Sequence, residues 1–403
     1  MTGGTGTGAG TGTGAGTGTG ADSGSRSDSG SGADEQVLLR TEGHAAYLTL
    51  NRPRALNALT HAMVRRIDEA LTAWEHDPAV RTVVIAGAGE RGLCAGGDIR
   101  AIYEDARVGS EGRAPGSDSA AAADNPSASA SADFWRDEYR LNARIANYPK
   151  PYVAVMDGIV MGGGVGVSAH GDVRIVTERS RIAMPETGIG FVPDVGGTYL
   201  LALAPGELGT HLALTGTQIG AADALLCGLA DHFVPHDDLP RLLDDLATRP
   251  VWDVLKDHVE QPPPGDLAGQ RPWIDACYGA DTVEEIVDRL RGHGAAGADA
   301  AADTLGAKSP TALKVTLAAL RAAPALGPLE RVLEQEYRIS CAALDSYDLV
   351  EGIRAQVIDK DRSPRWKPAT LAEVTGADVA RHIGAPPAGG ELHLATTPQE
   401  VAW

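Results

Sequence analysis

Two carboxylates and a run of glycines lie close together near the middle of this 403-residue chain. Gly162–Gly164 follow a short apolar segment that begins at Tyr152, and a glycine turn that enters a helix presents bare backbone N–H groups. Glu186 and Asp194 follow, eight positions apart, each beside a proline in a turn-like setting. Such N–H groups can hold negative charge that develops on an oxygen, and a carboxylate can act as a base or nucleophile. The combination indicates chemistry at a carbonyl group.

A third carboxylate, Glu138, falls on the apolar face of a predicted helix. Phe134, Leu141 and Ile145 recur with it at helical spacing. A buried carboxylate is unfavourable unless it is hydrogen-bonded or functional. From the pattern alone, a structural role as a hydrogen-bonding group is the commoner outcome for such a residue.

The elements that must position these residues follow from the order of apolar patterns. Strands and helices alternate up to the break at Gln261–Gly265, and only helical patterns follow it, which favours an α/β core with a helical C-terminal region. The composition predicts four parts: a disordered Gly/Thr-rich tail (1–34), the core (35–260), the helical region (261–375) and a second tail (376–403). Within the core, residues 107–131 are a low-complexity insertion, which we interpret as a spacer in preference to a lid.

Charge and cysteine usage exclude several classes of function. The formal net charge of −19 disfavours binding to nucleic acid or to an acidic membrane, both of which require a basic face. No apolar run is long enough to span a membrane, and the first residues do not resemble a secretory signal. The four cysteines are widely spaced, as expected of reduced thiols, so we predict a cytoplasmic protein.

Two weaker motifs allow alternative interpretations. Gly87–Gly92 matches the GxGxxG pattern of dinucleotide-binding proteins, but the next amphipathic stretch begins only near Ile99, so a simple glycine-rich connection is the better interpretation. Near the C-terminus, four basic residues surround Trp366: Lys360, Arg362, Arg365 and Lys367. They form either a solvated charged turn or a counter-ion for phosphate groups.

Several motifs, taken in order, resemble the crotonase (enoyl-CoA hydratase/isomerase) superfamily. They are Cys94–Asp98 after a strand, Gly162–Gly164 after Asp157-Gly158, and Pro185-Glu186. The segments 183–197 and 358–368 are similar to the 3-hydroxyisobutyryl-CoA hydrolase branch of that superfamily, and the resemblance covers residues 36–375. It implies an α/β fold, a crotonase-like spiral of repeated ββα units with a helical C-terminal region.

The resemblance also implies roles for individual residues. The N–H groups of Gly97 and Gly163 correspond to the oxyanion hole for a thioester carbonyl. Glu186 corresponds to the group that attacks this carbonyl or activates water, and Asp194 to a carboxylate that orients the substrate's hydroxyl or transfers a proton. Glu138 corresponds to a carboxylate that contacts the substrate.

The substrate implied by the resemblance is an acyl-CoA thioester, with no metal and no other cofactor. The CoA moiety is expected along two segments, a loop and a turn: Arg54, Ala55 and Leu56, and Ala95, Asp98 and Ile99. Members of the superfamily are often trimers or hexamers, so a homo-oligomer is possible.

One departure from the hydratases bears on the type of reaction. Hydratases carry a second catalytic glutamate two residues after the triple glycine, where this chain has Gly166. We therefore predict hydrolysis of a short-chain 3-hydroxyacyl-CoA, with 3-hydroxyisobutyryl-CoA of valine catabolism as the best candidate. The alternatives are an enoyl-CoA isomerase or hydratase on the same fold and a non-catalytic acyl-CoA-binding protein.

Overall fold

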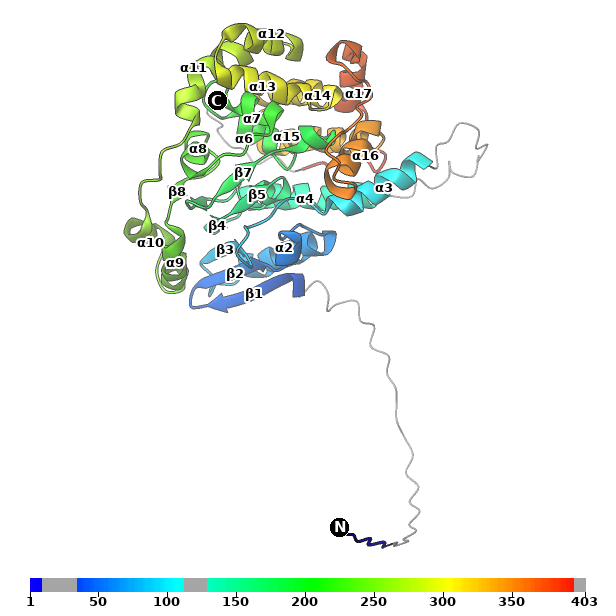
Figure 1. Cartoon of the computed structure of the whole chain (residues 1–403). Coiled ribbons are helices and arrows are strands. Elements are labelled where there is room, and N and C mark those ends of the chain that lie inside the picture. Colours follow the sequence, from blue (N-terminus) through cyan, green and yellow to red (C-terminus); the bar gives the residue numbers. More distant parts are fainter. Residues whose placement is uncertain (9–34, 112–128, 395–403) are drawn as a thin grey trace.

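The computed structural model describes residues 1–8, 35–111 and 129–394 (Figure 1). Its main sheet has the strand order β1-β2-β3-β4-β6-β8, in which β1 and β2 are antiparallel and the other neighbours are parallel. The strands are β1 (Val37–Glu42), β2 (Ala45–Leu50), β3 (Thr82–Gly87), β4 (Tyr152–Met156), β6 (Val173–Val176) and β8 (His232–Phe233). A second, smaller sheet pairs β5 (Ile159–Met161) with β7 (Arg181–Ala183).

Both faces of the main sheet are buried, and alternate side chains serve the two faces. In β4, Val153 and Val155 pack with α9 (Leu239–Leu246) and α10 (Val251–His258) in one cluster. Their neighbours in β4 belong to the larger cluster that includes α2 (His61–Glu75). Because successive residues of a strand point to opposite faces, a continuous apolar run such as that of β4 is what a doubly covered strand requires.

The main sheet and the small sheet are linked turn by turn into a spiral. After β3, the chain pairs with the small sheet through bridges from Gly92 to Gly158 and from Cys94 to Val160. After β4 and β6, it enters β5 and β7 in the same way, and Ile219 bridges to Ile182. Each turn thus contributes to both sheets, as the crotonase-like spiral predicts. Gly87–Gly92 lies in one of these connections, as expected of a glycine-rich segment that links two strands.

Helices follow the strands and then make up the whole C-terminal region. The core carries α3 (Ile99–Glu111), α4 (Ala130–Ala146), α5 (Gly163–Gly166), α6 (Gly197–Ala202), α7 (Leu208–Thr215) and α8 (Ala221–Leu226). The C-terminal region comprises α11 (Leu267–Tyr278), α12 (Val283–His293), α13 (Ala296–Gly306), α14 (Pro310–Leu326), α15 (Leu329–Ala343), α16 (Tyr347–Ile353) and α17 (Gly376–Gly384). Figure 1 shows these helices stacked over the end of the core opposite β1.

Two predicted boundaries differ from the structure. The insertion expected at 107–131 overlaps the end of α3 and the start of α4, and its residues 112–128 lie outside the described ranges. The tail expected from residue 376 begins with α17, in which Val379 and Ile383 pack against a buried cluster of α14 and α15. Two apolar residues one helical turn apart are too few to stand out among Ala, Gly and Pro, so the pattern did not predict this helix.

The C-terminal region is fitted closely to the turn that carries Glu186. A Cβ on Gly352 of α16 would lie only 2.4 Å from the Ile189 carbonyl oxygen, and a Cβ on Gly190 would lie 2.3 Å from the Asp348 carbonyl oxygen. Both contacts are between backbones, which cannot move aside as a side chain can. The short helix η3 (Glu186–Ile189) is therefore held by α16.

This packing predicts that Gly352→Ala destabilises the fold. The added methyl group must separate α16 from η3, and such overpacking typically costs about 1–3 kcal/mol. The free energy of unfolding, measured in urea, should fall by this amount. Gly292→Ala is the matched control, because Gly292 is also helical but has open space around its Cβ position. Equal stability of the two variants would contradict the close packing of α16 on η3.

Candidate active site

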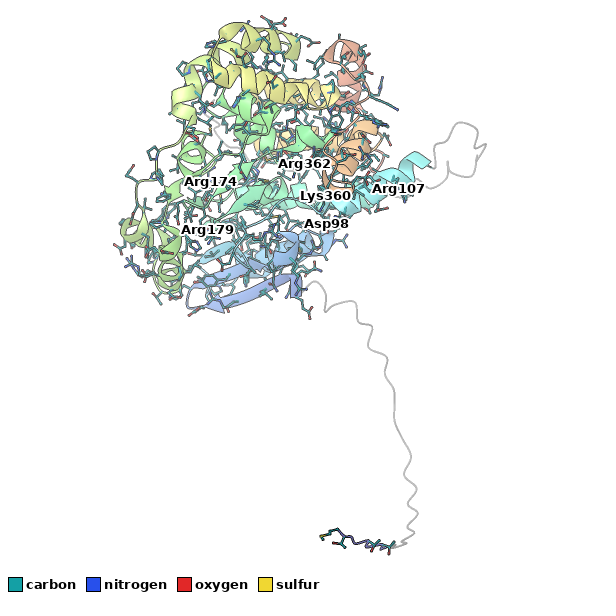
Figure 2. The ribbon with its side chains drawn as sticks, viewed as in Figure 1. Asp98, Arg107, Arg174, Arg179, Lys360 and Arg362 are labelled. Carbon is teal, nitrogen blue, oxygen red and sulfur yellow. The ribbon has the colours of Figure 1, made fainter. Side chains whose placement is uncertain are left out.

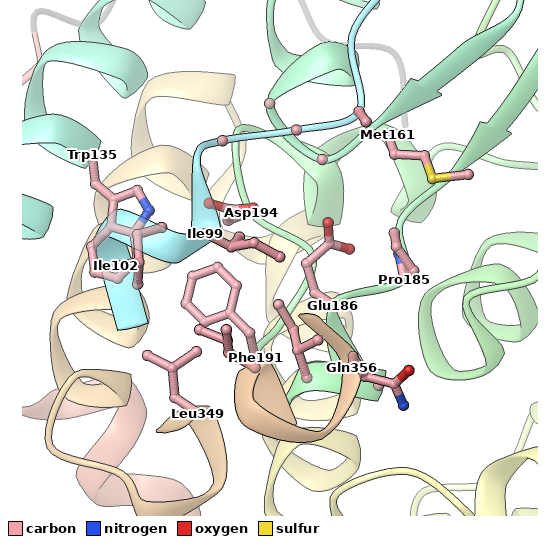
Figure 3. Close-up of a pocket in the computed structure, with 18 of the residues that line it drawn as sticks. Ile99, Ile102, Trp135, Met161, Pro185, Glu186, Phe191, Asp194, Leu349 and Gln356 are labelled. Carbon is pink, nitrogen blue, oxygen red and sulfur yellow. The ribbon is translucent and has the colours of Figure 1, made fainter. Parts of the chain in front are cut away.

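A cavity of about 330 Å³ lies between the core and the C-terminal region. The C-terminal region contributes four lining residues to it: Lys308, Leu349, Ile353 and Gln356. Figure 3 shows the Glu186 carboxylate pointing toward the segment that carries Met161, with Ile99, Phe191 and Leu349 on the other side. The cavity therefore has one polar side near the glycine turns and one apolar side.

Two backbone N–H groups of the glycine turns have no acceptor among the residues that the structure describes. Gly97 lies in a turn fixed by hydrogen bonds from Leu59 N to Gly96 O and from Asp98 N to Leu59 O, both 2.9 Å long. Gly163 is the first residue of α5, where an N–H has no intrahelical acceptor. Within the described ranges, neither N–H donates a hydrogen bond to another residue. A Cβ on Gly163 would lie 3.3 Å from the Gly97 nitrogen, so both groups border one space.

Glu186 is buried beside this space. Its Oε1 lies 3.0 Å from the position that a Cβ on Gly162 would take, and its Oε2 is buried without a partner among the described residues. Removal from water raises the pKa of the carboxyl well above the ordinary value of 4.5, and Asp194 raises it further. Lys308, which lines the same cavity, opposes this rise. Glu186 is thus a desolvated carboxyl group with a free oxygen.

Asp194 is equally buried but is hydrogen-bonded. Its Oδ2 accepts a bond of 2.7 Å from the Tyr139 hydroxyl, whose oxygen lies 2.7 Å from the Ser340 hydroxyl. Since Tyr139 donates to Asp194, Ser340 must donate to Tyr139. Burial raises the pKa of Asp194 to about 7, and the hydrogen bond from Tyr139 limits the rise.

The backbone after Asp194 is held in an unusual conformation. Val195 has a φ of 54°, in the left-handed region that β-branched residues rarely adopt. Gly197 N bonds to Asp194 O, and His170 Nε2 lies 2.7 Å from Val195 O. Burial lowers the pKa of His170 to about 4, so the neutral ring donates this bond. A strained residue of this kind persists only where its surroundings fix it, here beside a buried carboxyl group.

Glu138 faces the same glycine turns from α4. Its Oε1 has no partner among the described residues and lies 2.6 Å from the position of a Cβ on Gly163. Burial raises its pKa well above 4.5, and Asp194 adds to the rise. Three carboxyl groups therefore share one poorly solvated cavity, where the charge of Asp194 raises the pKa of the other two.

The structure places seven of the predicted site residues on the cavity wall: Ala95, Gly97, Ile99, Glu138, Gly163, Glu186 and Asp194. Asp98 is not among the lining residues, and its carboxylate pairs with Arg52 at 3.1 Å. Arg54, Ala55 and Leu56 also lie outside the wall, although the Leu56 carbonyl accepts a bond from Ala95 N. Contact between CoA and these four residues stays a prediction.

Sequence reasoning missed the lining residues of the C-terminal region and the partner of Asp194. Lys308 lies more than a hundred residues from Glu186 in the chain, so no local spacing could connect the two. Tyr139 directly follows Glu138, and its position in the sequence alone does not distinguish it from an ordinary core residue. Its hydroxyl could have been singled out, because a buried Tyr O–H usually has a polar partner.

Comparison with known proteins shows which family this chain is similar to. A family model described as enoyl-CoA hydratase/isomerase matches residues 45–383. A mitochondrial 3-hydroxyisobutyryl-CoA hydrolase of Danio rerio is 43% identical over 354 residues, which are 85% of this chain and 88% of the relative. The mitochondrial 3-hydroxyisobutyryl-CoA hydrolase of Homo sapiens is 42% identical over 362 residues, 87% of this chain and 89% of the relative.

Two crystal structures are similar to the fold over most of its length. One, described as a carnitinyl-CoA dehydratase from Mycobacterium thermoresistibile, has a TM-score of 0.81 at 53% identity and covers 89% of this chain and 98% of its own. The other, described as an enoyl-CoA hydratase from Rhodobacter sphaeroides 2.4.1, has a TM-score of 0.78 at 42% identity and covers 89% of this chain and 100% of its own.

The hydrolase relatives also correct one prediction. Their names place them in the mitochondrion, which contradicts the cytoplasmic location predicted from the sequence. The four cysteines are unpaired in the structure, but free thiols indicate only a reducing environment and do not identify the compartment. Among the described helices, none is both long and apolar enough to cross a membrane.

Glycine N–H groups and buried carboxyl groups are thus held at one cavity by a spiral of paired strands, and the family model extends over nearly all of the described core and C-terminal region. This chain belongs to the enoyl-CoA hydratase/isomerase family of the crotonase superfamily.

Proposed function

We propose that this protein hydrolyses the thioester of a short-chain 3-hydroxyacyl-CoA, with 3-hydroxyisobutyryl-CoA as the best candidate substrate. The names of the hydrolase relatives support this substrate, which belongs to valine breakdown. The observation that carries the proposal is the Glu186 oxygen next to two N–H groups, all three without a partner among the described residues. The reaction uses water and requires no cofactor besides the CoA of the substrate.

The N–H groups of Gly97 and Gly163 serve as donors to the thioester oxygen. As the carbonyl carbon becomes tetrahedral, this oxygen gains negative charge, which donors held in place stabilise more strongly than the ground state. Glu186 either adds to the carbonyl carbon or removes a proton from the water that does so. In both cases the C–S bond breaks and the CoA sulfur takes up a proton. Where Glu186 adds to the carbonyl carbon, water then cleaves the resulting anhydride, which releases the acid and restores the carboxylate.

Asp194 and Glu138 are suited to recognising the 3-hydroxyl group. Asp194 has one oxygen bonded to Tyr139, and Glu138 has a free Oε1 beside Gly163. A carboxylate accepts a hydrogen bond from a hydroxyl group, whereas an unsubstituted acyl chain offers no donor to either carboxyl group. A buried site that loses such a hydrogen bond discriminates strongly between two substrates. We therefore expect a higher kcat/KM for hydroxylated acyl chains.

The descriptions of the two similar structures favour a second candidate, dehydration of a 3-hydroxyacyl-CoA or hydration of an enoyl-CoA. Space around Gly166 argues against it. A Cβ at this position would lie 2.7 Å from Val195 Cβ and 2.9 Å from Asn142 Nδ2, so there is no room for the second carboxylate of the hydratases. Asp194 is left as the partner of Glu186, as the resemblance to the hydrolases implies.

A panel of short acyl-CoA esters, assayed for free thiol, tests this function. Ester cleavage releases CoA with a free thiol group, whereas hydration and dehydration leave the thioester intact. We expect the highest kcat/KM with 3-hydroxyacyl esters and a lower value with the matching chains that lack the hydroxyl group. An acyl-CoA-binding protein without activity would bind the panel and release no thiol. Loss of water from the hydroxylated esters without thiol release would support the dehydratase.

Lys308 provides a test of the charge on Glu186. Hydrolysis requires ionised Glu186, so activity should rise with pH through the raised pKa of this carboxyl group. Lys308→Met removes the cation that opposes the rise, and the acid limb of the pH profile of kcat/KM should therefore move to higher pH. Activity should recover in alkaline solution, and Lys308→Arg should keep the wild-type profile.

Lys314→Met is the matched control for this change. Lys314 lies in α14 and pairs with Glu284 at 2.7 Å, and it is not among the residues that line the cavity. Its loss should leave the pH profile in place. A uniform loss of activity at every pH in Lys308→Met would contradict an effect through the ionisation of Glu186.

A further inference from the structure

The segment Asp359–Lys367, which we call the basic hook, follows a π-helical turn, η5 (Arg354–Ile358). Lys360 and Arg362 adopt φ values of 59° and 55°, so the backbone turns back on itself at both positions. The hook alternates acidic and basic residues at its start. Backbone conformation of this kind, in residues other than glycine, is kept where the surroundings impose it.

The acidic residues of the hook are bound by one arginine. Arg354 donates to Asp359 and Asp361, both at 2.7 Å, and it also binds both oxygens of Glu351 at 2.8 Å. By contrast, Lys360, Arg362 and Arg365 are exposed and have no carboxylate oxygen within 4 Å among the described residues. The carboxylates of the hook are therefore bound by Arg354, whereas the three basic side chains are exposed to solvent.

Two hydrogen bonds attach the hook to residues that adjoin the wall of the cavity. Arg362 N donates to Ala355 O, next to the lining residue Gln356. Trp366 Nε1 donates to Ala307 O at 3.1 Å, next to the lining residue Lys308. Gln356 is exposed as well as lining, so the hook runs along the mouth of the cavity.

A further contact places the hook beside α3. Arg100 donates to Val357 O at 3.3 Å, which joins the start of α3 to the turn before the hook. Figure 2 shows Lys360 near Asp98, the residue that precedes α3, with Arg362 in the same region. The cations therefore gather where the core and the C-terminal region meet, on a protein whose net charge is −19.

The proposed substrate explains why cations should gather there. A cavity of about 330 Å³ holds the acyl group and the adjoining part of the pantetheine arm, but it is too small for a whole acyl-CoA. The nucleotide end, with its phosphate groups, must lie outside the mouth. An acidic protein repels such an anion unless a local group of cations counteracts the repulsion.

We propose that the basic hook is the subsite that binds the phosphate groups of CoA, with Lys360 and Arg362 as its principal contacts. This inference rests on the proposed function for its ligand. The guanidinium group offers paired donors to phosphate oxygens, and the ammonium group offers a compact charge. The hook determines the affinity for the CoA part of the substrate and leaves the chemical step unaffected.

The test compares two thioesters of the same acyl group, one of CoA and one of N-acetylcysteamine, which keeps the thiol end but carries no phosphate. For the double variant Lys360→Gln, Arg362→Gln, we expect KM for the CoA ester to rise roughly fivefold to thirtyfold, the scale of two exposed charge contacts. The value of kcat and the kcat/KM for the short ester should not change. Exchange of the two cations, Lys360→Arg with Arg362→Lys, should keep KM near the wild-type value.

The control variant Lys256→Gln, Arg291→Gln removes the same charge elsewhere. Lys256 lies on α10 and pairs with Asp253, and Arg291 lies on α12 and pairs with Asp303 of α13. Their loss should leave KM unchanged. An equal rise in KM in this control would overturn the proposal in favour of a general charge effect. Equal losses on both esters in the hook variant would also overturn it, because they would show a displaced cavity wall.

Binding measurements test the hook even if the proposed hydrolase activity is absent. If the wild-type protein cleaves neither ester, the hook is judged by the dissociation constants of CoA and of pantetheine, measured by calorimetry. The hook variant should then weaken the binding of CoA and spare that of pantetheine. Unchanged affinity for CoA would contradict the phosphate subsite, whatever the reaction is.

Discussion

Replacement of Glu186 by glutamine is expected to abolish nearly all turnover while the protein still binds its acyl-CoA ester. The amide neither attacks the carbonyl carbon nor accepts a proton from water, yet it has the same size. A loss of roughly two to four orders of magnitude in kcat, about 3–5 kcal/mol of barrier, is the scale for one catalytic carboxylate. Rapid-quench measurement of thiol release, together with the dissociation constant of the ester, separates the two effects.

The same variant should be more stable than the wild-type protein at neutral pH. The pKa of Glu186 is raised above 4.5 in the folded state. Between the unfolded and folded pKa values the folded state binds more protons, so stability falls as pH rises through this range. Glutamine never ionises and removes this penalty. A higher melting temperature at pH 7, with no difference below pH 4, is the expected result.

Glu285→Gln is the control for this substitution. Glu285 lies on α12 and pairs with Arg289 at the surface, far along the chain from the cavity. Its loss should change neither kcat nor the pH dependence of stability. Near-normal hydrolysis by Glu186→Gln would refute the mechanism and would require another group to act on the thioester.

Gly163→Ala should have the second largest effect. The methyl group would lie 2.6 Å from Glu138 Oε1, 3.2 Å from Leu59 Cδ1 and 3.3 Å from the Gly97 nitrogen. It would occupy the space that the Gly97 and Gly163 N–H groups border, where we propose that the thioester oxygen binds. Loss of one such donor typically costs roughly 10²–10³ in kcat, and this change obstructs two.

Steady-state kinetics on a cleaved ester provide the measurement for Gly163→Ala, with Gly376→Ala as control. Gly376 begins α17 and has nothing within 4 Å of its Cβ position. Circular dichroism must show a folded variant, since Leu59 and Glu138 are also crowded. A folded Gly163→Ala protein with wild-type kcat would contradict the assignment of the N–H pair as the oxyanion hole.

Much of the core could be predicted because local pattern and burial agree there. In α2, Met63, Ile67, Leu71 and Trp74 recur at helical spacing, and all four are buried. The β4 segment is apolar without interruption, as a strand covered on both faces must be. Where the residues of one face of a helix or strand are all buried, their apolar pattern in the sequence is enough to predict the element.

Prediction failed where long-range contacts decide the structure. Helix α11 contains Pro272, and a proline inside a segment normally predicts a break in a helix. The helix persists because Leu267, Ile274 and Tyr278 are buried against neighbouring helices, which offsets the lost backbone hydrogen bond. The C-terminal wall of the cavity could not be foreseen for the same reason. Gln356 and Lys308 reach it through tertiary packing.

Among the site residues, too, those that lie close together in the sequence could be predicted better than those whose position depends on long-range contacts. Glu186 and Asp194 lie within one short segment, so their spacing already indicated a shared site. Asp98 belongs to the motif, and its contact with CoA stays a prediction. In the structure its side chain is bound by Arg52. The motif therefore identified the turn correctly, whereas the orientation of the Asp98 side chain depended on a residue outside it.

The central claim is that this cavity cleaves a 3-hydroxyacyl-CoA at its thioester bond. The most direct measurement is the mass balance of one reaction, with 3-hydroxyisobutyryl-CoA as substrate and mass spectrometry to quantify every product. We expect free CoA and 3-hydroxyisobutyrate in equal amounts, at a rate that Glu186→Gln abolishes. Recovery of an intact thioester that has lost water, with no free CoA, would contradict the claim.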